Sequence, residues 1–160
     1  MEPIYSEAEI NNFSTQLLQI LFQPHNPYYG GHFNFSECFP ETIQRHMTDF
    51  ITDDLKELGH TVQHSLWTAA SLMAFRIFEE TVMVHVSIDL NISINNIHLG
   101  KAIDHMSKTF KKSFVEELHK IRKLRNKGMH PEHQFSRQEV IDLIYDILWI
   151  FLFVYSIPPE

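Results

Sequence analysis

The chain has few of the residues that mark several protein classes. Cys38 is the single cysteine among 160 residues, which excludes an internal disulfide framework and favours a reducing compartment. The five glycines form no phosphate loop, because Leu99-Gly100-Lys101 lacks the other glycine and the Ser or Thr of that motif. The first residues lack the basic start and apolar run of a signal peptide, and the apolar stretch 147–157 is too short for a bilayer span. We therefore expect a cytoplasmic protein with no membrane partner.

Basic residues are scarce except in one stretch. The net charge is −7, from 13 Lys and Arg against 20 Asp and Glu, which alone argues against a nucleic-acid partner. However, eight of the 13 basic residues lie between residues 108 and 127, where only Glu116 and Glu117 oppose them. A positive element on an acidic body is typical of a local anion-binding site, with a solvated helix face as the alternative.

Helical periodicity covers most of the chain and predicts one all-α domain, an up-and-down bundle of about five helices. Ser6 and Ser136 each begin a capping box. Gly59 is expected to end the second helix and Thr61 to cap the third. The predicted helices cover residues 7–22, 43–58, 61–78, 96–127 and 136–157, the fourth with a break near 107–109.

Two segments do not fit this pattern. Apolar and polar residues alternate over 84–94, which is typical of a strand, and the available partner is a short extended piece at 32–36. Because a lone strand would leave its backbone hydrogen bonds unpaired, we favour the alternative, in which the third helix continues into 84–94 and the chain becomes extended near 91–96. Residues 23–40, rich in proline, glycine and aromatics, predict a loop long enough to act as a lid or partner-binding insert.

The last helix is apolar on nearly every side, so it must be covered on every side. A second subunit is the expected cover, and a central position in a monomer is the alternative. The eleven histidines favour no metal site, since His60 and His64 lack further ligands in a zinc spacing. Cys38 has no identifiable base beside it. We expect no metal and no cofactor.

The strongest chemical signal lies where the basic helix meets the apolar one. Arg125 and His130 are separated by four residues, and in a continuous helix their side chains would point about 140° apart. Gly128 can end the helix in a left-handed conformation, and Pro131 discourages its resumption. The predicted break lets His130 turn back toward Arg125.

This motif resembles the HEPN superfamily, whose nucleases carry an Arg, four to six residues and then a His, often with a polar residue after the Arg, as at Asn126. Segments 74–80, 99–103 and 121–131 are similar to successive parts of that family, so 61–157 reads as the family-like core. Residues 1–60 match nothing in it, and 84–94 departs from it. The resemblance implies a dimerising helical bundle in which two Arg/His pairs cut RNA without a metal, often as a toxin or antiviral defence effector, with an antitoxin or sensor protein as a further partner.

The residue chemistry suits that expectation. An imidazole can remove or supply a proton at neutral pH, so His130 is the candidate acid or base. Arg125 can hold the phosphate as charge builds on it, and Asn126 can orient the imidazole or bind a phosphate oxygen. Glu79 or Glu80 could position the arginine, or could simply pair with Arg76. The expected contacts to flanking RNA phosphates are Lys120, Arg122, Lys123 and Lys127.

Two alternatives remain open. The fold could be a non-catalytic dimerisation or interaction module, with Arg125 and His130 making structural hydrogen bonds. It could also bind a nucleotide or a small signalling anion at the end of the basic helix.

Overall fold

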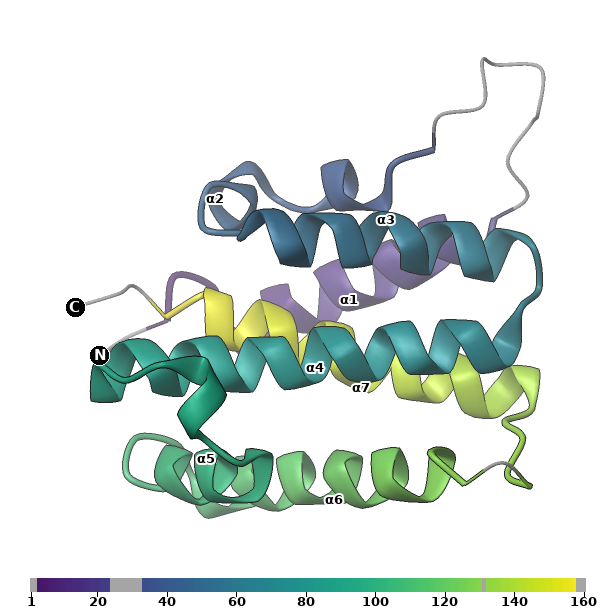
Figure 1. Cartoon of the computed structure of the whole chain (residues 1–160). Helices are drawn as coiled ribbons and strands as arrows, with labels where there is room; N and C mark the ends of the chain where they lie inside the picture. The colour runs from purple at the N-terminus through teal and green to yellow at the C-terminus, as the bar shows by residue number, and fades with distance from the viewer. Residues whose placement is uncertain (1–2, 24–32, 131, 158–160) are drawn as a thin grey trace. The chain divides into compact units, whose positions relative to one another are not determined.

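The structure, a computed structural model, describes residues 3–23, 33–130 and 132–157, and its regular elements are all helical (Figure 1). The all-α class is confirmed. No strand occurs in the described residues, so the extended pair expected at 32–36 and 84–94 is wrong wherever the structure describes it. The elements are α1 (Glu7–Phe22), the 3₁₀ helix η1 (Phe35–Cys38), α2 (Glu41–Gln44), α3 (Asp49–Gln63), α4 (Trp67–Leu90), the 3₁₀ helix η2 (Ile94–Asn96), α5 (Leu99–Met106), α6 (Lys112–Gly128) and α7 (Arg137–Tyr155).

The chain divides into two compact units, and α4 contributes to both. Unit 1 comprises Met1–Ile77 with Phe135–Glu160, and unit 2 comprises Phe78–Gln134. Charge follows this division: unit 1 contains four Lys or Arg and thirteen Asp or Glu, whereas unit 2 contains nine and seven. The basic motif of the sequence therefore belongs to the less acidic unit.

In unit 1, α7 packs along α1, as the yellow and purple ribbons of Figure 1 show. Both helices begin with the predicted capping box, at Ser6 and Ser136, where each serine accepts a hydrogen bond from the third helical residue. Residues Val140, Leu143, Ile144, Ile147, Leu148, Ile150, Phe151, Leu152 and Val154 of α7 are buried within the chain. The expectation that α7 needs a second subunit as its cover is wrong, because the chain itself covers it.

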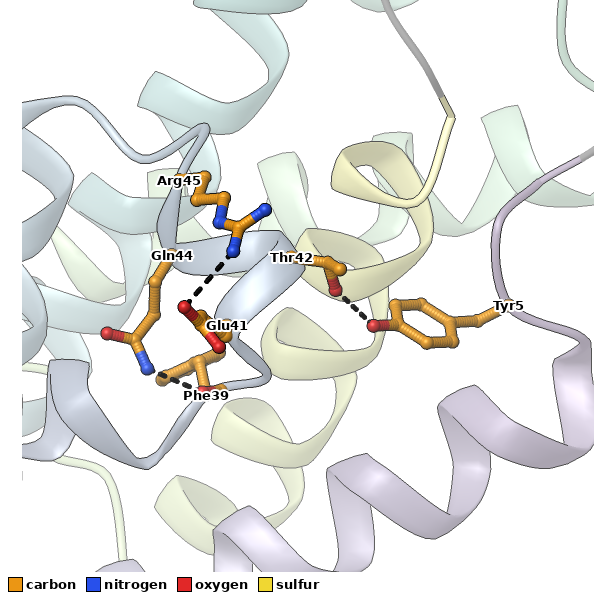
Figure 2. Close-up of polar contacts among 6 residues, drawn as sticks. All are labelled: Tyr5, Phe39, Glu41, Thr42, Gln44 and Arg45. Carbon is orange, nitrogen blue, oxygen red and sulfur yellow. Dashed lines mark hydrogen bonds and ion pairs between the residues drawn. The ribbon is translucent and has the colours of Figure 1, made fainter.

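The described part of the aromatic segment belongs to the core of unit 1. Phe35 is fully buried and Phe39 nearly so, and their rings meet edge to face with centroids 5.3 Å apart. Figure 2 shows the following turn: Gln44 donates to the Phe39 carbonyl over 2.7 Å, and the Tyr5 and Thr42 hydroxyls are hydrogen-bonded. The lid interpretation of 23–40 is not supported by residues 33–40, and residues 24–32 lie outside the described part.

Gly59 does not end a helix, and the prediction of a break there is wrong. It lies inside α3 against η1: a Cβ added to it would lie 3.1 Å from Phe33 Cε1 and 3.1 Å from Phe35 Cβ. Thr61 is likewise inside α3 and bonds the Leu58 carbonyl instead of capping a new helix. The chain turns at Ser65, whose φ of 56° is the left-handed conformation that ends helices.

In unit 2, the alternating segment is helical as far as Leu90, so the helix-continuation alternative holds for this part. Val82 and Val86, one turn apart, are fully buried and anchor this end of α4. Asn91 ends the helix with φ 51°, and the Ile92 amide bonds the Ser87 carbonyl over 3.2 Å. The alternating apolar residues do not form the buried face of a strand, because Ile88 is 70% exposed and Leu90, Ile92 and Ile94 are also exposed.

The predicted interruption near 107–109 is confirmed, since α5 ends at Met106 and α6 begins at Lys112. The two helices pack against each other. Among the residues that the structure describes, no helix is both long and apolar enough to cross a bilayer.

Candidate functional site

The basic helix of the sequence is α6, and its last turn carries Arg125 and Lys127. Phe114, Val115, Leu118 and Ile121 form its buried face, so the cations stand on the remaining surface. Cations near a helix C-terminus interact favourably with the helix dipole, which stabilises this arrangement. Arg125 and Lys127 therefore lie where the local backbone tolerates positive charge best.

Arg125 is held by Glu79 of α4. Its Nε forms an ion pair with Glu79 Oε1, and about a third of each side chain is exposed. Its Nη1 donates to Asn126 Oδ1 over 3.2 Å. The guanidinium is thus fixed from two sides, and the expected alternative, an ion pair of Glu79 with Arg76, does not form because Arg76 pairs with Asp54 at 3.3 Å.

The end of α6 differs from the predicted break. Gly128 is the last helical residue and Met129 follows in the right-handed conformation, with φ −76° and ψ −11°. The Met129 amide bonds the Arg125 carbonyl over 3.1 Å and the His130 amide bonds the Lys127 carbonyl over 3.2 Å, so the right-handed turn continues to His130. The predicted left-handed Gly128 is wrong, and Pro131 lies outside the described residues.

His130 is exposed at the end of this turn. Within residues 33–130, no hydrogen bond or ion pair joins its imidazole to Arg125. Both belong to unit 2, and both reach its surface. The structure brings Arg125 together with Asn126 and Glu79, and leaves His130 on the next turn of chain.

The four predicted phosphate ligands differ in their surroundings. Lys123 and Lys127 are exposed. Lys120 forms an ion pair with Glu117, with its Nζ 3.7 Å from Glu117 Oε1. Arg122 is half-buried against α5: its Nε is buried and has no hydrogen-bond partner among the described residues, and its Nη1 would lie 3.5 Å from a Cβ added to Gly100. The three lysines are therefore exposed, and Arg122 is the least accessible of the four.

Sequence reasoning missed two histidine–carboxylate pairs in unit 2. His105 Nε2 lies 2.6 Å from Asp89 Oδ2, and His119 Nε2 lies 2.9 Å from Asp104 Oδ1. The two residues of each pair are about four helical turns apart in the sequence, so no short-range spacing predicts that they meet. The hydrogen bond from His105 lowers the pKa of Asp89, partly opposed by burial.

The two remaining sequence candidates are ordinary structural groups. Burial raises the pKa of the Cys38 thiol, and Glu37 raises it further, which disfavours the reactive thiolate. The His60 and His64 rings lie 4.4 Å apart, with His64 Nδ1 against the His60 carbonyl. Across residues 3–23, 33–130 and 132–157, no three His, Cys, Asp or Glu side chains gather in a way that could hold a metal ion.

Comparison with known proteins adds no family: no protein-family model, no curated protein and no solved structure matches this chain.

Proposed function

We propose that the chain is a metal-independent endoribonuclease whose site combines Arg125 and His130 from two copies of the chain. The observation that carries the proposal is the ion pair between Glu79 and Arg125, which holds a guanidinium at the end of a basic helix, about one turn before the exposed His130. The HEPN resemblance of the sequence agrees with this assignment. A toxin or defence role, with a restraining protein partner, follows from the same resemblance.

Each side chain has a definite task in this chemistry. His130 removes the proton of the RNA 2′-hydroxyl in one copy, and its counterpart supplies a proton to the leaving 5′-oxygen. Arg125 keeps N–H groups beyond those facing Glu79 and Asn126, and these bind the phosphate as charge builds on it. Glu79 acts as a positioning residue, since it contacts the guanidinium and not the substrate.

The surrounding surface fits an RNA strand and a second copy. Lys123 and Lys127 are exposed beside Arg125 and would contact the flanking phosphates, giving binding that weakens with salt. Leu124 and Met129, on either side of Arg125 in the chain, are 36% and 60% exposed. A second copy covering these two side chains would bring the two Arg/His pairs together.

The test is RNA cleavage in excess EDTA by the wild type and by His130→Ala. Cleavage by the wild type and a loss of at least about a hundredfold in His130→Ala are expected, the usual size of an acid–base contribution. His98→Ala is the matched control, because His98 is an exposed histidine of the same unit. Intact RNA with the wild type, or equal rates for the two variants, contradicts the nuclease.

Arg125→Lys and Glu79→Gln separate positioning from chemistry. Lysine keeps the charge but loses the planar fork, so Arg125→Lys should lower kcat more than it raises KM. Glu79→Gln should lower kcat less, with recovery in Glu79→Asp. The ion pair of Glu79 with Arg125 also suits a non-catalytic interaction module. In that case Glu79→Gln lowers the thermal stability, and neither the wild type nor any variant cleaves RNA. Separately, a solution mass that shows only monomer excludes a site built from two copies of the chain.

A further inference from the structure

A second cluster in unit 2 lies around His85, on the part of α4 that the sequence pattern left ambiguous. The His85 ring is half-buried and meets the Phe110 ring edge-on, with centroids 5.4 Å apart at 61°. Phe110 in turn packs on Phe114 of α6, at 5.0 Å. His85 thus joins α4 to the turn between α5 and α6 through an apolar contact.

The same cluster contains a charged contact between α4 and α5. Asp89, one turn after His85, accepts a hydrogen bond from His105 Nε2 over 2.6 Å. The His105 side chain is 15% exposed and that of Asp89 is 51% exposed. Lys108, just after α5, also lowers the pKa of Asp89 through its positive charge.

The groups acting on His85 oppose its protonation on balance. Burial is the largest cause of its lowered pKa, the carboxylate of Asp89 acts in the opposite direction, and His105 of α5 lowers the pKa further. From α6 the side chain next to the cluster is the apolar Phe114. A proton on His85 is therefore stabilised better in water than in the closed contact.

We propose that His85, Phe110 and the Asp89–His105 pair form a proton-sensitive latch that opens the contact between the end of α4 and the α5–α6 turn as the pH falls. In the closed form, neutral His85 packs on Phe110. A proton added to His85 places a cation against the apolar Phe110 ring, and the neighbouring His105 disfavours that charge further. Opening lets His85 reach water and exposes Phe110 in the unit where Ile88 and Leu90 are already exposed. This latch is independent of the proposed nuclease.

The sign and size of the effect follow from linkage. Because the closed-state pKa of His85 is lowered, its contribution to stability is fully present above the open-state value of about 6.5 and is lost as the pH falls below it. At pH 5.5 an exposed histidine with that pKa is about ten times more often protonated than neutral. Opening can therefore be favoured by up to about tenfold relative to pH 7.5.

Hydrogen exchange on the full chain at pH 7.5 and 5.5, corrected for intrinsic rates, tests the latch. Residues 82–90 and 106–115 of the wild type should lose up to about tenfold in protection at pH 5.5. In His85→Gln, which cannot be protonated, this pH-dependent loss should disappear. In His98→Gln, a change at an exposed histidine of the same unit, the wild-type response should persist.

Equal losses in the wild type and His85→Gln would overturn the latch, as would a lost response in His98→Gln. If His85→Gln fails to fold, NMR titration of the wild-type ring decides. A midpoint for His85 clearly below about 6.5 supports the latch, and a midpoint at or above that value overturns it.

Discussion

Gly59→Ala tests whether tight packing, and not turn formation, explains the glycine inside α3. The added methyl group would lie 3.1 Å from Phe33 Cε1 and 3.1 Å from Phe35 Cβ. The ring of Phe33 can rotate away. Phe35 is fully buried and its Cβ is fixed to the backbone of η1, so α3 and η1 must separate by a few tenths of an ångström.

Two terms of opposite sign set the size of the effect. Alanine is favoured over glycine inside a helix by about 1 kcal/mol. Overpacking a tight contact costs about 1–3 kcal/mol. We expect packing to dominate, giving a net loss of about 1 kcal/mol and a fall in Tm of about 3 °C for a chain of this length.

Thermal and urea unfolding of the purified variants measure this loss. Gly100→Ala is the matched control, because the nearest atom to its added Cβ is Arg122 Nη1, at an ordinary 3.5 Å. It should be neutral or stabilising by up to about 1 kcal/mol. If Gly59→Ala is stabilised as much as Gly100→Ala, the packing explanation is refuted.

Three smaller changes test the other contacts. Ser136→Ala removes the capping hydroxyl of α7 and should lower the free energy of unfolding by about 1 kcal/mol in urea titration, whereas Ser136→Asp should retain most of it. Trp149→Phe removes the 2.6 Å hydrogen bond to Asn11 Oδ1 and should lose about 1 kcal/mol, with less than additive loss when combined with Asn11→Ala. The pKa of Asp89 is lowered in the folded chain, so its stabilisation is present above about pH 4 and lost as the pH falls through the folded value; Asp89→Asn should flatten Tm against pH in that acidic range, and an unchanged profile contradicts the pairing.

Helix existence was predictable because caps and apolar periodicity act locally. Ser6 and Ser136 are followed three residues later by Glu, and each box forms as the pattern indicates. Gly59 misled the prediction, since a glycine required by a neighbouring chain segment looks the same in sequence as one required by a turn. Ser65, which does take the left-handed conformation, carries no such signal.

The strand-like pattern at 84–94 failed for a different reason. Its even-numbered apolar residues include Val86, which is buried one turn after Val82 and continues the buried side of α4. A helix buries such pairs and leaves Ile88 exposed, whereas a strand would need a partner for its backbone. Satisfied backbone hydrogen bonds thus outweigh the exposure of Ile88 and Leu90 in α4.

The candidate site depends on a choice of partners that a short motif cannot predict. Arg76 and Glu79 lie close together on α4, so an ion pair between them is the better expectation from the sequence. The burial of Asp54, which is 5% exposed, decides the outcome: burial raises the pKa of that carboxyl, the guanidinium of Arg76 opposes the rise, and the two form an ion pair. Arg76 therefore pairs with Asp54 of α3, and Glu79 pairs with Arg125. The position of the proposed active-site Arg125 therefore depends on a second ion pair, between Arg76 and the buried Asp54 of α3.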